Sequence, residues 1–208
     1  MRPTRRSAAI AVAVLVTTIV VVAARSRRRA PPAEAIPAPS TITASSLRFL
    51  AVGRQGYGNR ASRQIAEAME HVAAIAPTHG VFYLGDNFYP RGVESVDDKQ
   101  WQSKFEQLYD GPRLRGMPFF AVVGNHDHEG QPAAEGQYAR EHRGSGRWQM
   151  DDLYYTRDFG RANGRVLLRI VFFDTILMQA SPDSQLAFDR RALEAPGDPV
   201  WQVLAGHR

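Results

Sequence analysis

Four short apolar runs in the sequence each end in a glycine followed by a polar residue. The endings are Val52-Gly53-Arg54, Leu84-Gly85-Asp86, Val123-Gly124-Asn125 and Ala205-Gly206-His207. In α/β folds, the carboxyl ends of the strands form the edge where ligand sites lie. Glycine lets the backbone turn sharply at such an edge, so that the next side chain can point into a common crevice. The pattern therefore predicts an α/β domain with one polar site built from several strand ends.

The spacing of apolar residues predicts the elements between these endings, because strand-like runs alternate with helical patterns. Strands are expected at 47–52, 81–84, 119–123, 166–173 and 200–205, and helices at 61–76, 97–109 and 185–193. Four apolar residues share one face of the first helix and are expected to be buried: Ile65, Met69, Val72 and Ala76. In the second helix, Trp101, Phe105 and Leu108 are expected in the core. This order of elements favours parallel strands.

The polar residues at the strand ends are of the types that bind metal ions. Gly124-Asn125-His126-Asp127-His128 places four such side chains in five residues directly after a buried strand. Asp, Asn and His supply oxygen and nitrogen ligands, and a carboxylate can bridge two cations. A single Gly-Asp or Gly-Asn pair would more simply mark a turn. The agreement of several strand ends favours a metal site.

Composition excludes several function classes. The chain of 208 residues has no cysteine, which excludes disulfide scaffolds, thiolate zinc sites and a cysteine nucleophile. Of its 26 Lys and Arg residues, seven lie in the first 40 positions, where Glu34 is the one acidic residue among 21. The remainder carries 19 basic and 20 acidic residues, so a basic face for nucleic acid is not expected.

The N-terminal segment carries a targeting signal. Ala8 to Ala24 is an uncharged apolar run of 17 residues with arginines on both sides. Its length fits either a signal peptide or a short transmembrane anchor, and the four arginines that follow it favour the anchor. We expect a signal or anchor at 1–29, a Pro/Ala-rich linker at 30–46 and the functional domain at 47–208. The domain is then expected outside the cytoplasm, either secreted or attached to the membrane.

Two blocks of the sequence resemble the signatures of a known family. Leu84-Gly85-Asp86-Asn87-Phe88-Tyr89 and the Gly124 to His128 block resemble those of the calcineurin-like metallophosphoesterases, most closely the mammalian-type purple (tartrate-resistant) acid phosphatases. The resemblance implies a β-sandwich flanked by helices, here incomplete and preceded by an N-terminal hydrophobic helix. It also implies a dinuclear centre of Fe with Fe, Zn or Mn and the hydrolysis of small phosphate monoesters by a metal-held hydroxide.

The resemblance also gives individual residues roles. Asp86 matches the aspartate that bridges the two metals, and Tyr89 matches the tyrosine whose phenolate binds the ferric ion. Asn125 and His207 match ligands of the second metal. His126 matches the catalytic histidine near the phosphate and the leaving group.

Two departures from the family pattern bear on this prediction. The first family motif is Gly-Asp-x-Gly, but Arg54 stands here in place of the metal-binding aspartate, and a guanidinium has no lone pair for a cation. A later Gly-His-x-His block is absent from these 208 residues, which predicts a C-terminally truncated chain. Four of seven expected ligands are present, so one metal or none is expected.

Three hypotheses about function follow. The chain is an exported or anchored acid phosphatase impaired by these departures, or a non-catalytic phosphate-binding or interaction module on the same fold. In a third alternative, Arg54 contacts the phosphate while one metal at Asp86, Asn125 and His207 supplies hydroxide. Two further expectations are that Asp174 accepts structural hydrogen bonds and that Arg140 to Arg147 form a solvated basic loop.

Overall fold

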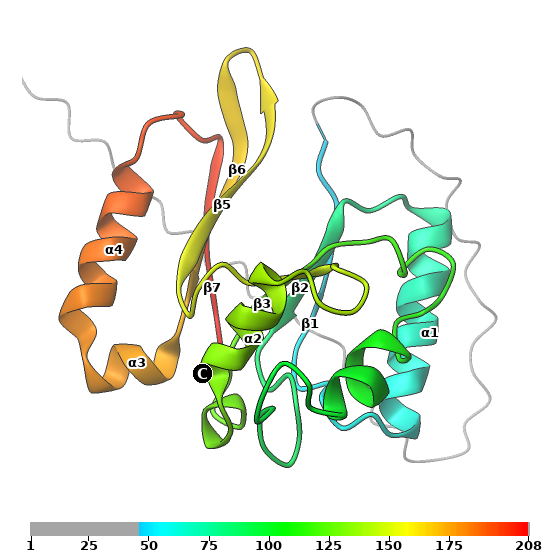
Figure 1. Ribbon diagram of the computed structural model, residues 1–208. Coiled ribbons are helices and arrows are strands. Elements are labelled where there is room, and N and C mark those ends of the chain that lie inside the picture. The colour runs from blue at the N-terminus through cyan, green and yellow to red at the C-terminus, as the bar shows by residue number, and fades with distance from the viewer. Residues whose placement is uncertain (1–45, 208) are drawn as a thin grey trace, which may run out of the picture. The chain divides into compact units, whose positions relative to one another are not determined.

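The computed structural model describes residues 46–207 (Figure 1). The predicted signal or anchor and nearly all of the predicted linker lie outside the described residues. Within residues 46–207, no helix has the length and apolar character needed to cross a membrane.

The first sheet contains the strands that carry three of the four glycine endings. All of its strand pairs are parallel, in the order β1-β2-β3-β4. The strands are β1 (Phe49–Val52), β2 (Gly80–Leu84), β3 (Phe119–Val122) and β4 (Trp148–Gln149). The predicted strands at 47–52, 81–84 and 119–123 are thus confirmed to within two residues. The sequence did not predict the short strand β4.

The second sheet carries the fourth glycine ending. Its strands are β5 (Tyr155–Ala162), β6 (Arg165–Phe173) and β7 (Trp201–Gly206). β5 pairs antiparallel with β6, and β7 pairs parallel with β6. The predicted strands at 166–173 and 200–205 are confirmed, whereas β5 was not predicted. β7 forms an edge of this sheet, and Trp201 on it is 63% exposed.

Aromatic side chains fill the space between the two sheets. The Phe159 ring of β5 lies 4.9 Å from both the Phe49 ring of β1 and the Phe120 ring of β3. The Phe82 ring of β2 lies 5.9 Å from the Phe172 ring of β6. Edge contacts of this kind stabilise a packed core. The predicted sandwich is therefore present, with α1 beside the first sheet and α3 and α4 beside the second (Figure 1).

Helix α1 (Arg60–Ile75) buries a different face from the predicted one. Its N-terminus is capped by Asn59, whose side chain accepts a hydrogen bond from the backbone N–H of Ser62 at 3.0 Å. The buried residues are Ser62, Ala66, Met69 and Ala73. Ile65 and Val72 are 40% and 41% exposed, so of the predicted face only Met69 is in the core. Small side chains on the inner face let this helix approach the sheet closely, a preference that apolar periodicity does not report.

In the segment predicted as a helix at 97–109, helical structure begins at residue 100. It contains a π-helical turn at Gln102–Glu106, and Asp98 accepts the backbone N–H of Gln100 at 2.9 Å. Trp101 and Phe105 are buried as predicted, and Leu108 packs against the core.

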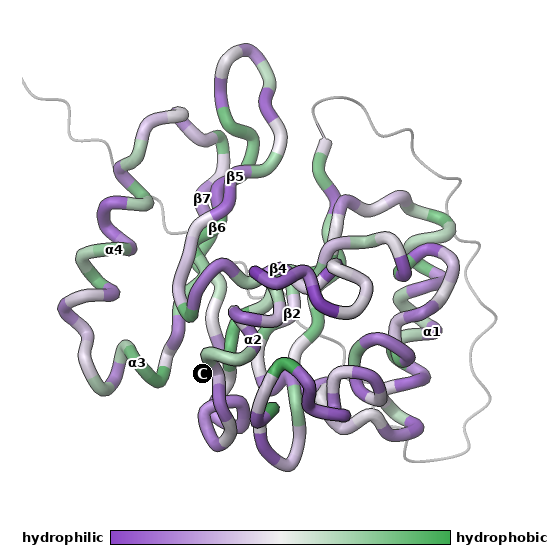
Figure 2. Tube along the Cα trace, viewed as in Figure 1, coloured by the Kyte–Doolittle hydropathy of each residue, from purple (hydrophilic) through white to green (hydrophobic). Residues whose placement is uncertain are grey.

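The remaining helices lie around the strand ends and beside the second sheet. They are a 3₁₀ turn at Asp127–Glu129, α2 (Pro132–Arg140), α3 (Thr175–Ala180) and α4 (Pro182–Glu194). The predicted helix at 185–193 is confirmed as part of α4. Hydrophobic and hydrophilic residues alternate along α4 (Figure 2), and its buried residues are Gln185 and Ala192.

The expectation of a solvated basic loop at 140–147 is wrong for its last residue. Arg147 is buried, and its guanidinium donates to the backbone oxygens of Tyr109 (2.5 Å), Leu114 (3.2 Å) and Glu106 (2.8 Å). It also pairs with the Glu106 carboxylate at 3.2 Å and lies 4.8 Å from the centre of the Phe105 ring. The backbone oxygens of Glu106 and Tyr109 lie at the C-terminal end of the 97–109 segment, where carbonyl groups have no partner within the helix. They explain why the Arg147 guanidinium is buried.

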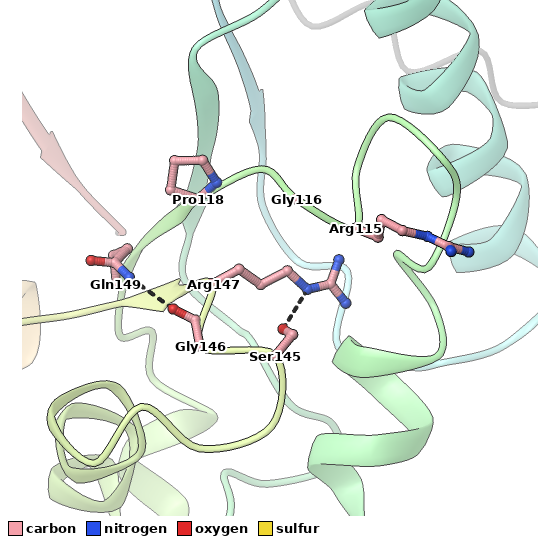
Figure 3. A pocket seen from close by; sticks show the side chains of 7 residues that line it. All are labelled: Arg115, Gly116, Pro118, Ser145, Gly146, Arg147 and Gln149. Atoms are coloured by element: carbon pink, nitrogen blue, oxygen red, sulfur yellow. Dashed lines mark hydrogen bonds between the residues drawn. The ribbon is translucent and has the colours of Figure 1, made fainter.

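A small open pocket adjoins this arginine (Figure 3). Its volume is about 210 Å³, and its lining contains none of the predicted site residues. The lining residues are Arg115, Gly116, Pro118, Ser145, Gly146, Arg147 and Gln149. Arg147 Nε donates to Ser145 Oγ at 2.8 Å, which fixes the loop rather than leaving the arginine free for a ligand.

Candidate metal and phosphate site

The predicted site forms around the Asp86 carboxylate, which is fully buried at the end of β2. Asp86 adopts a left-handed backbone conformation with φ 54°, and Gly85 before it has φ 79°. This conformation is uncommon for a residue with a side chain, and Asp is one of the residues that tolerate it. The two carboxylate oxygens, Oδ1 and Oδ2, contact different neighbours. We refer to these two parts of the site as the Oδ1 side and the Oδ2 side.

On the Oδ2 side, Asp86 is already engaged by protein groups. The Tyr89 hydroxyl donates a hydrogen bond to Oδ2, and the Nε atom of Arg54 lies 3.8 Å from the same oxygen. Arg54 Nε also donates to the Tyr89 hydroxyl oxygen at 3.4 Å. Burial, and then the hydrogen bond to Asp86, raise the pKa of Tyr89 to about 12. In this arrangement Tyr89 is a neutral donor to Asp86.

On the Oδ1 side, Asp86 meets a backbone donor and a histidine nitrogen. The His126 N–H donates to Oδ1 at 3.2 Å, and His207 Nε2 lies 3.3 Å from it. His207 Nδ1 lies 2.8 Å from the backbone oxygen of Leu84. Because a carbonyl oxygen only accepts, Nδ1 carries the proton, and in the neutral ring Nε2 is an acceptor that faces another acceptor.

Asn125 adds a third acceptor that is not engaged. Its Oδ1 atom is buried and has no hydrogen-bond partner among residues 46–207, and the same holds for His207 Nε2. Buried polar atoms are rarely left unpaired, so each such case needs an explanation. A buried amide oxygen and a buried imidazole nitrogen that lack donors are, like the Asp86 carboxylate, ligands suited to a divalent cation.

Glycines at two strand ends allow His207 and Asp86 to approach the neighbouring backbone closely. A Cβ on Gly85 would lie 2.6 Å from His207 Nδ1, and the positive φ of Gly85 disfavours a side chain as well. A Cβ on Gly124 would lie 2.3 Å from the backbone N of Asp86. The prediction that the strand ends converge is therefore confirmed, although β7 belongs to the second sheet and the other three strands to the first.

His126 lies at the edge of this group. Its Nδ1 is 2.7 Å from the backbone oxygen of Pro90, so Nδ1 carries the proton and Nε2 remains available to accept or transfer one. Its ring centre lies 4.4 Å from that of Tyr89. The structure thus places His126 beside the Asp86 and Tyr89 pair.

Sequence reasoning counted Asp127 among the metal-binding types of the Gly124 to His128 block without giving it a role of its own. In the structure its carboxylate ties the site loops together. It accepts backbone N–H groups from Asn87 at 2.9 Å, Phe88 at 3.1 Å and Gly124 at 2.7 Å. Burial raises the pKa of Asp127 to about 7 against the opposing effect of these bonds. Nearby, the Asn87 side chain donates to Glu135 Oε2 at 2.8 Å, and burial, followed by the Asp127 charge, raises the pKa of Glu135.

Asp174 makes the structural hydrogen bonds that were predicted for it. Its Oδ1 accepts from the backbone N–H groups of Ile176 and Leu177 and so caps α3. Its Oδ2 lies 2.7 Å from Nε2 of His128, which received no role from the sequence. This contact links the turn after β3 to the end of β6.

The fit to a metal differs between the two sides of Asp86. Within residues 46–207, no three His, Asp or Glu side chains gather in a way that could hold a cation. Asp86 Oδ1, Asn125 Oδ1 and His207 Nε2 could hold one ion if the amide oxygen is counted. The Oδ2 side carries a guanidinium and a hydroxyl donor, so it does not fit a second ion.

Comparisons with known proteins agree with the resemblance seen in the sequence. Residues 58–208 match the calcineurin-like phosphoesterase family. Tartrate-resistant acid phosphatase type 5 of Sus scrofa is 35% identical over 184 residues, which cover 77% of this chain and 53% of that protein. The Homo sapiens protein of the same name is 32% identical and covers 68% of this chain and 45% of its own length.

A solved structure and a plant relative extend the comparison. GAP50, described as the anchor in the inner membrane complex of Plasmodium, has a TM-score of 0.65 at 20% identity, over 77% of this chain and 54% of that chain. At this identity the likeness concerns the fold alone. Purple acid phosphatase 4 of Arabidopsis thaliana is 34% identical over 91 residues, 43% of this chain and 26% of that protein. The chain spans about half the length of the mammalian relatives it matches.

Proposed function

Because the chain belongs to the calcineurin-like phosphoesterase family, we propose that it is a metal-dependent hydrolase of small phosphate monoesters, of the acid phosphatase type. In this proposal Asp86, Asn125 and His207 hold a metal ion, iron, zinc or manganese, and His126 is the catalytic residue. The alternative is a non-catalytic phosphate-binding module on the same fold.

One observation carries the proposal. His207 Nε2 and Asp86 Oδ1 lie 3.3 Å apart, and the proton on His207 Nδ1 leaves both atoms as acceptors when the ring is neutral. Two acceptors at this distance repel each other unless a positive charge lies with them. The unpaired Asn125 Oδ1 supplies one more ligand of the same kind. A cation would satisfy all three atoms at once.

The protein groups around the ion would fix its ligands. The His126 N–H and the Tyr89 hydroxyl hold the two oxygens of Asp86, and the Leu84 carbonyl holds His207 in one tautomer. Such outer contacts orient ligands and tune the metal. A bound cation would lower the pKa of its water and offset charge on the phosphoryl oxygens.

His126 has the position and the free nitrogen for proton transfer. Its Nδ1 proton is committed to the Pro90 carbonyl, so in the doubly protonated ring Nε2 would carry the proton that is given to a leaving alkoxide or phenoxide, and the ring would return to the neutral form. The ring is held against Tyr89, which limits its motion. Loss of this transfer would slow esters with basic leaving groups more than aryl phosphates.

The proposed location depends on the N-terminal segment. We propose that residues 1–29 direct the chain out of the cytoplasm, as a signal peptide or as an anchor, and that residues 47–208 act there. A tag that reports residence outside the cytoplasm, fused after residue 208, would test this. Deletion of residues 8–24 should abolish the signal.

The activity is tested with the full chain and an aryl phosphate, from acid to neutral pH, after addition of Fe, Zn or Mn salts. We expect metal-dependent turnover that Asp86→Asn abolishes. Asp198→Asn is the matched control, because Asp198 is also a positive-φ aspartate but is exposed and pairs with Arg165. A folded chain that binds phosphate without turnover would favour the non-catalytic module instead.

A further inference from the structure

We infer that this site holds one metal ion rather than two, and that the Arg54 guanidinium supplies the second positive charge and binds a phosphate oxygen. The inference rests on the proposed function only for the identity of the ligand, a phosphate group. The sequence offered it as one alternative, and the geometry now gives it three independent supports.

The first support is that the Oδ2 side of Asp86 is closed to a cation. Oδ2 accepts the Tyr89 hydroxyl, and Arg54 Nε lies 3.8 Å away. A guanidinium stays protonated and offers no lone pair, so it cannot act as a ligand and repels a cation. A metal on this side would have to displace both groups.

The second support is that the backbone holds Arg54 in this place. Its N–H donates to the Gly85 oxygen at 2.9 Å, and its φ of 60° directs the chain around the end of β1. Gly56 donates to the Asp86 oxygen at 3.3 Å and accepts from the Tyr89 N–H at 3.0 Å. The loop that carries Arg54 is thus bonded to the loop that carries Asp86. These bonds fix the backbone of Arg54 next to the loop of Asp86.

The third support is that the outer end of Arg54 is available. Its side chain is 59% exposed, and its terminal nitrogens make no hydrogen bond with any residue in 46–207. Its Nε is held by Tyr89, and the Tyr57 ring stacks on the Tyr89 ring at 3.9 Å. A planar guanidinium fixed at one end presents two parallel donors, which match two oxygens of a phosphate.

The charges also balance with one ion. A divalent cation and Arg54 together carry three positive charges, and Asp86 removes one. The remaining charge matches a phosphate dianion. A second divalent ion beside Arg54 would leave a surplus of positive charge on the Oδ2 side, where Asp86 is the carboxylate that pairs with Arg54.

The test counts bound Zn²⁺ or Mn²⁺ on the full chain and measures binding of inorganic phosphate by calorimetry. We expect one equivalent of metal in the parent chain and in Arg54→Gln. Phosphate affinity of the metal-loaded Arg54→Gln variant should fall about tenfold or more, because a charge-assisted bond is lost. Arg54→Asp should bind a second equivalent, since it removes the repelling charge and adds a ligand.

Arg60→Asp is the matched control for charge, because Arg60 is exposed at the start of α1, where an aspartate is favourable. It should keep one equivalent of metal and the parent affinity for phosphate. Aspartate tolerates the positive φ of position 54, so Arg54→Asp should fold.

Three results would overturn the inference: two equivalents in the parent chain, unchanged phosphate affinity in Arg54→Gln, or a single equivalent in Arg54→Asp. Failure of the proposed function looks different. One bound ion and Arg54-dependent phosphate binding without hydrolysis would leave this inference standing and reject the enzyme. Hydrolysis by a chain that binds two ions would reject this inference and leave the proposed enzyme activity standing.

Discussion

His128 Nε2 lies 2.7 Å from Asp174 Oδ2, and this contact joins the turn after β3 in the first sheet to the end of β6 in the second. Asp174 is fully buried, and its other oxygen caps α3. Asp174 therefore holds both α3, which lies beside the second sheet, and the segment that carries Asn125 and His126. Contacts between the two sheets at this point hold together a candidate site whose residues come from both sheets.

Replacing Asp174 with Ala should lower the free energy of unfolding by about 2 to 4 kcal/mol, because it removes the cap of α3 and leaves His128 without its partner. Denaturant unfolding monitored by tryptophan fluorescence measures the change. Asp183→Ala is the control, since Asp183 is exposed in the first turn of α4, and it should change stability by less than about 0.5 kcal/mol. Equal effects of the two variants would contradict the prediction.

Arg147 gives a second prediction about stability. Arg147→Met should lower the free energy of unfolding by about 3 to 5 kcal/mol, because it removes the cationic partner of the nearly buried Glu106 carboxylate and the guanidinium donor to the backbone oxygens of Tyr109 and Glu106. Arg115→Met makes the same change at the rim of the same pocket, where the side chain is largely exposed (Figure 3). Arg115→Met should lower the free energy of unfolding much less than Arg147→Met does. A loss below about 1 kcal/mol for Arg147→Met would show that the guanidinium is not structural.

Glu135 predicts how stability changes with pH. Burial and the Asp127 charge raise its pKa above its ordinary 4.5. The folded state therefore binds the proton more tightly than the unfolded state, and this stabilisation is complete below about pH 4.5 and is lost as the pH rises through the raised pKa. The free energy of unfolding should fall with increasing pH, by up to about 1.4 kcal/mol per unit from this group.

The Glu135→Gln variant isolates this effect. A neutral amide can still accept the Asn87 side-chain hydrogen bond, so the variant should fold and show a weaker decline in stability between acid and neutral pH. Glu141→Gln, at the exposed C-terminal end of the same helix, should keep the parent profile. Parallel profiles for the parent chain and Glu135→Gln would contradict the assignment.

Much of the fold could be predicted, since five strands and the position of α1 follow from apolar runs and glycine endings. β5 was missed because polar residues fill most of its sequence, Tyr155–Ala162, and its strand character depends on pairing with β6. The buried face of α1 was assigned wrongly because apolar spacing favours Ile65 and Val72, whereas packing favoured alanines. Arg147 was assigned to solvent since sequence gives no sign of the carbonyl groups that it meets.

The candidate site shows the same limit. Spacing and resemblance pointed to Asp86, His126 and His207, and the structure places these three residues in contact, because strand ends meet at one edge of the fold. Asp127 and His128 stand in the same block, yet spacing cannot say that one points to backbone N–H groups and the other to Asp174. Side-chain direction at a turn depends on local backbone geometry that only the structure supplies.

Asn125 makes the last prediction, which concerns metal binding without activity. Its Oδ1 is buried and unpaired in the absence of a ligand, so Asn125→Leu removes a destabilising group and should leave the metal-free chain as stable as the parent or slightly more stable. The parent chain should gain about 2.7 kcal/mol when Zn²⁺ or Mn²⁺ is present at about one hundred times its Kd. Asn125→Leu should lose most of this gain, whereas Asp198→Asn should keep it. Thermal unfolding with added metal and with a chelator measures both. A variant that still gains the full metal-induced shift would show that the ion binds elsewhere, and a destabilised metal-free variant would show that Asn125 Oδ1 has a structural partner.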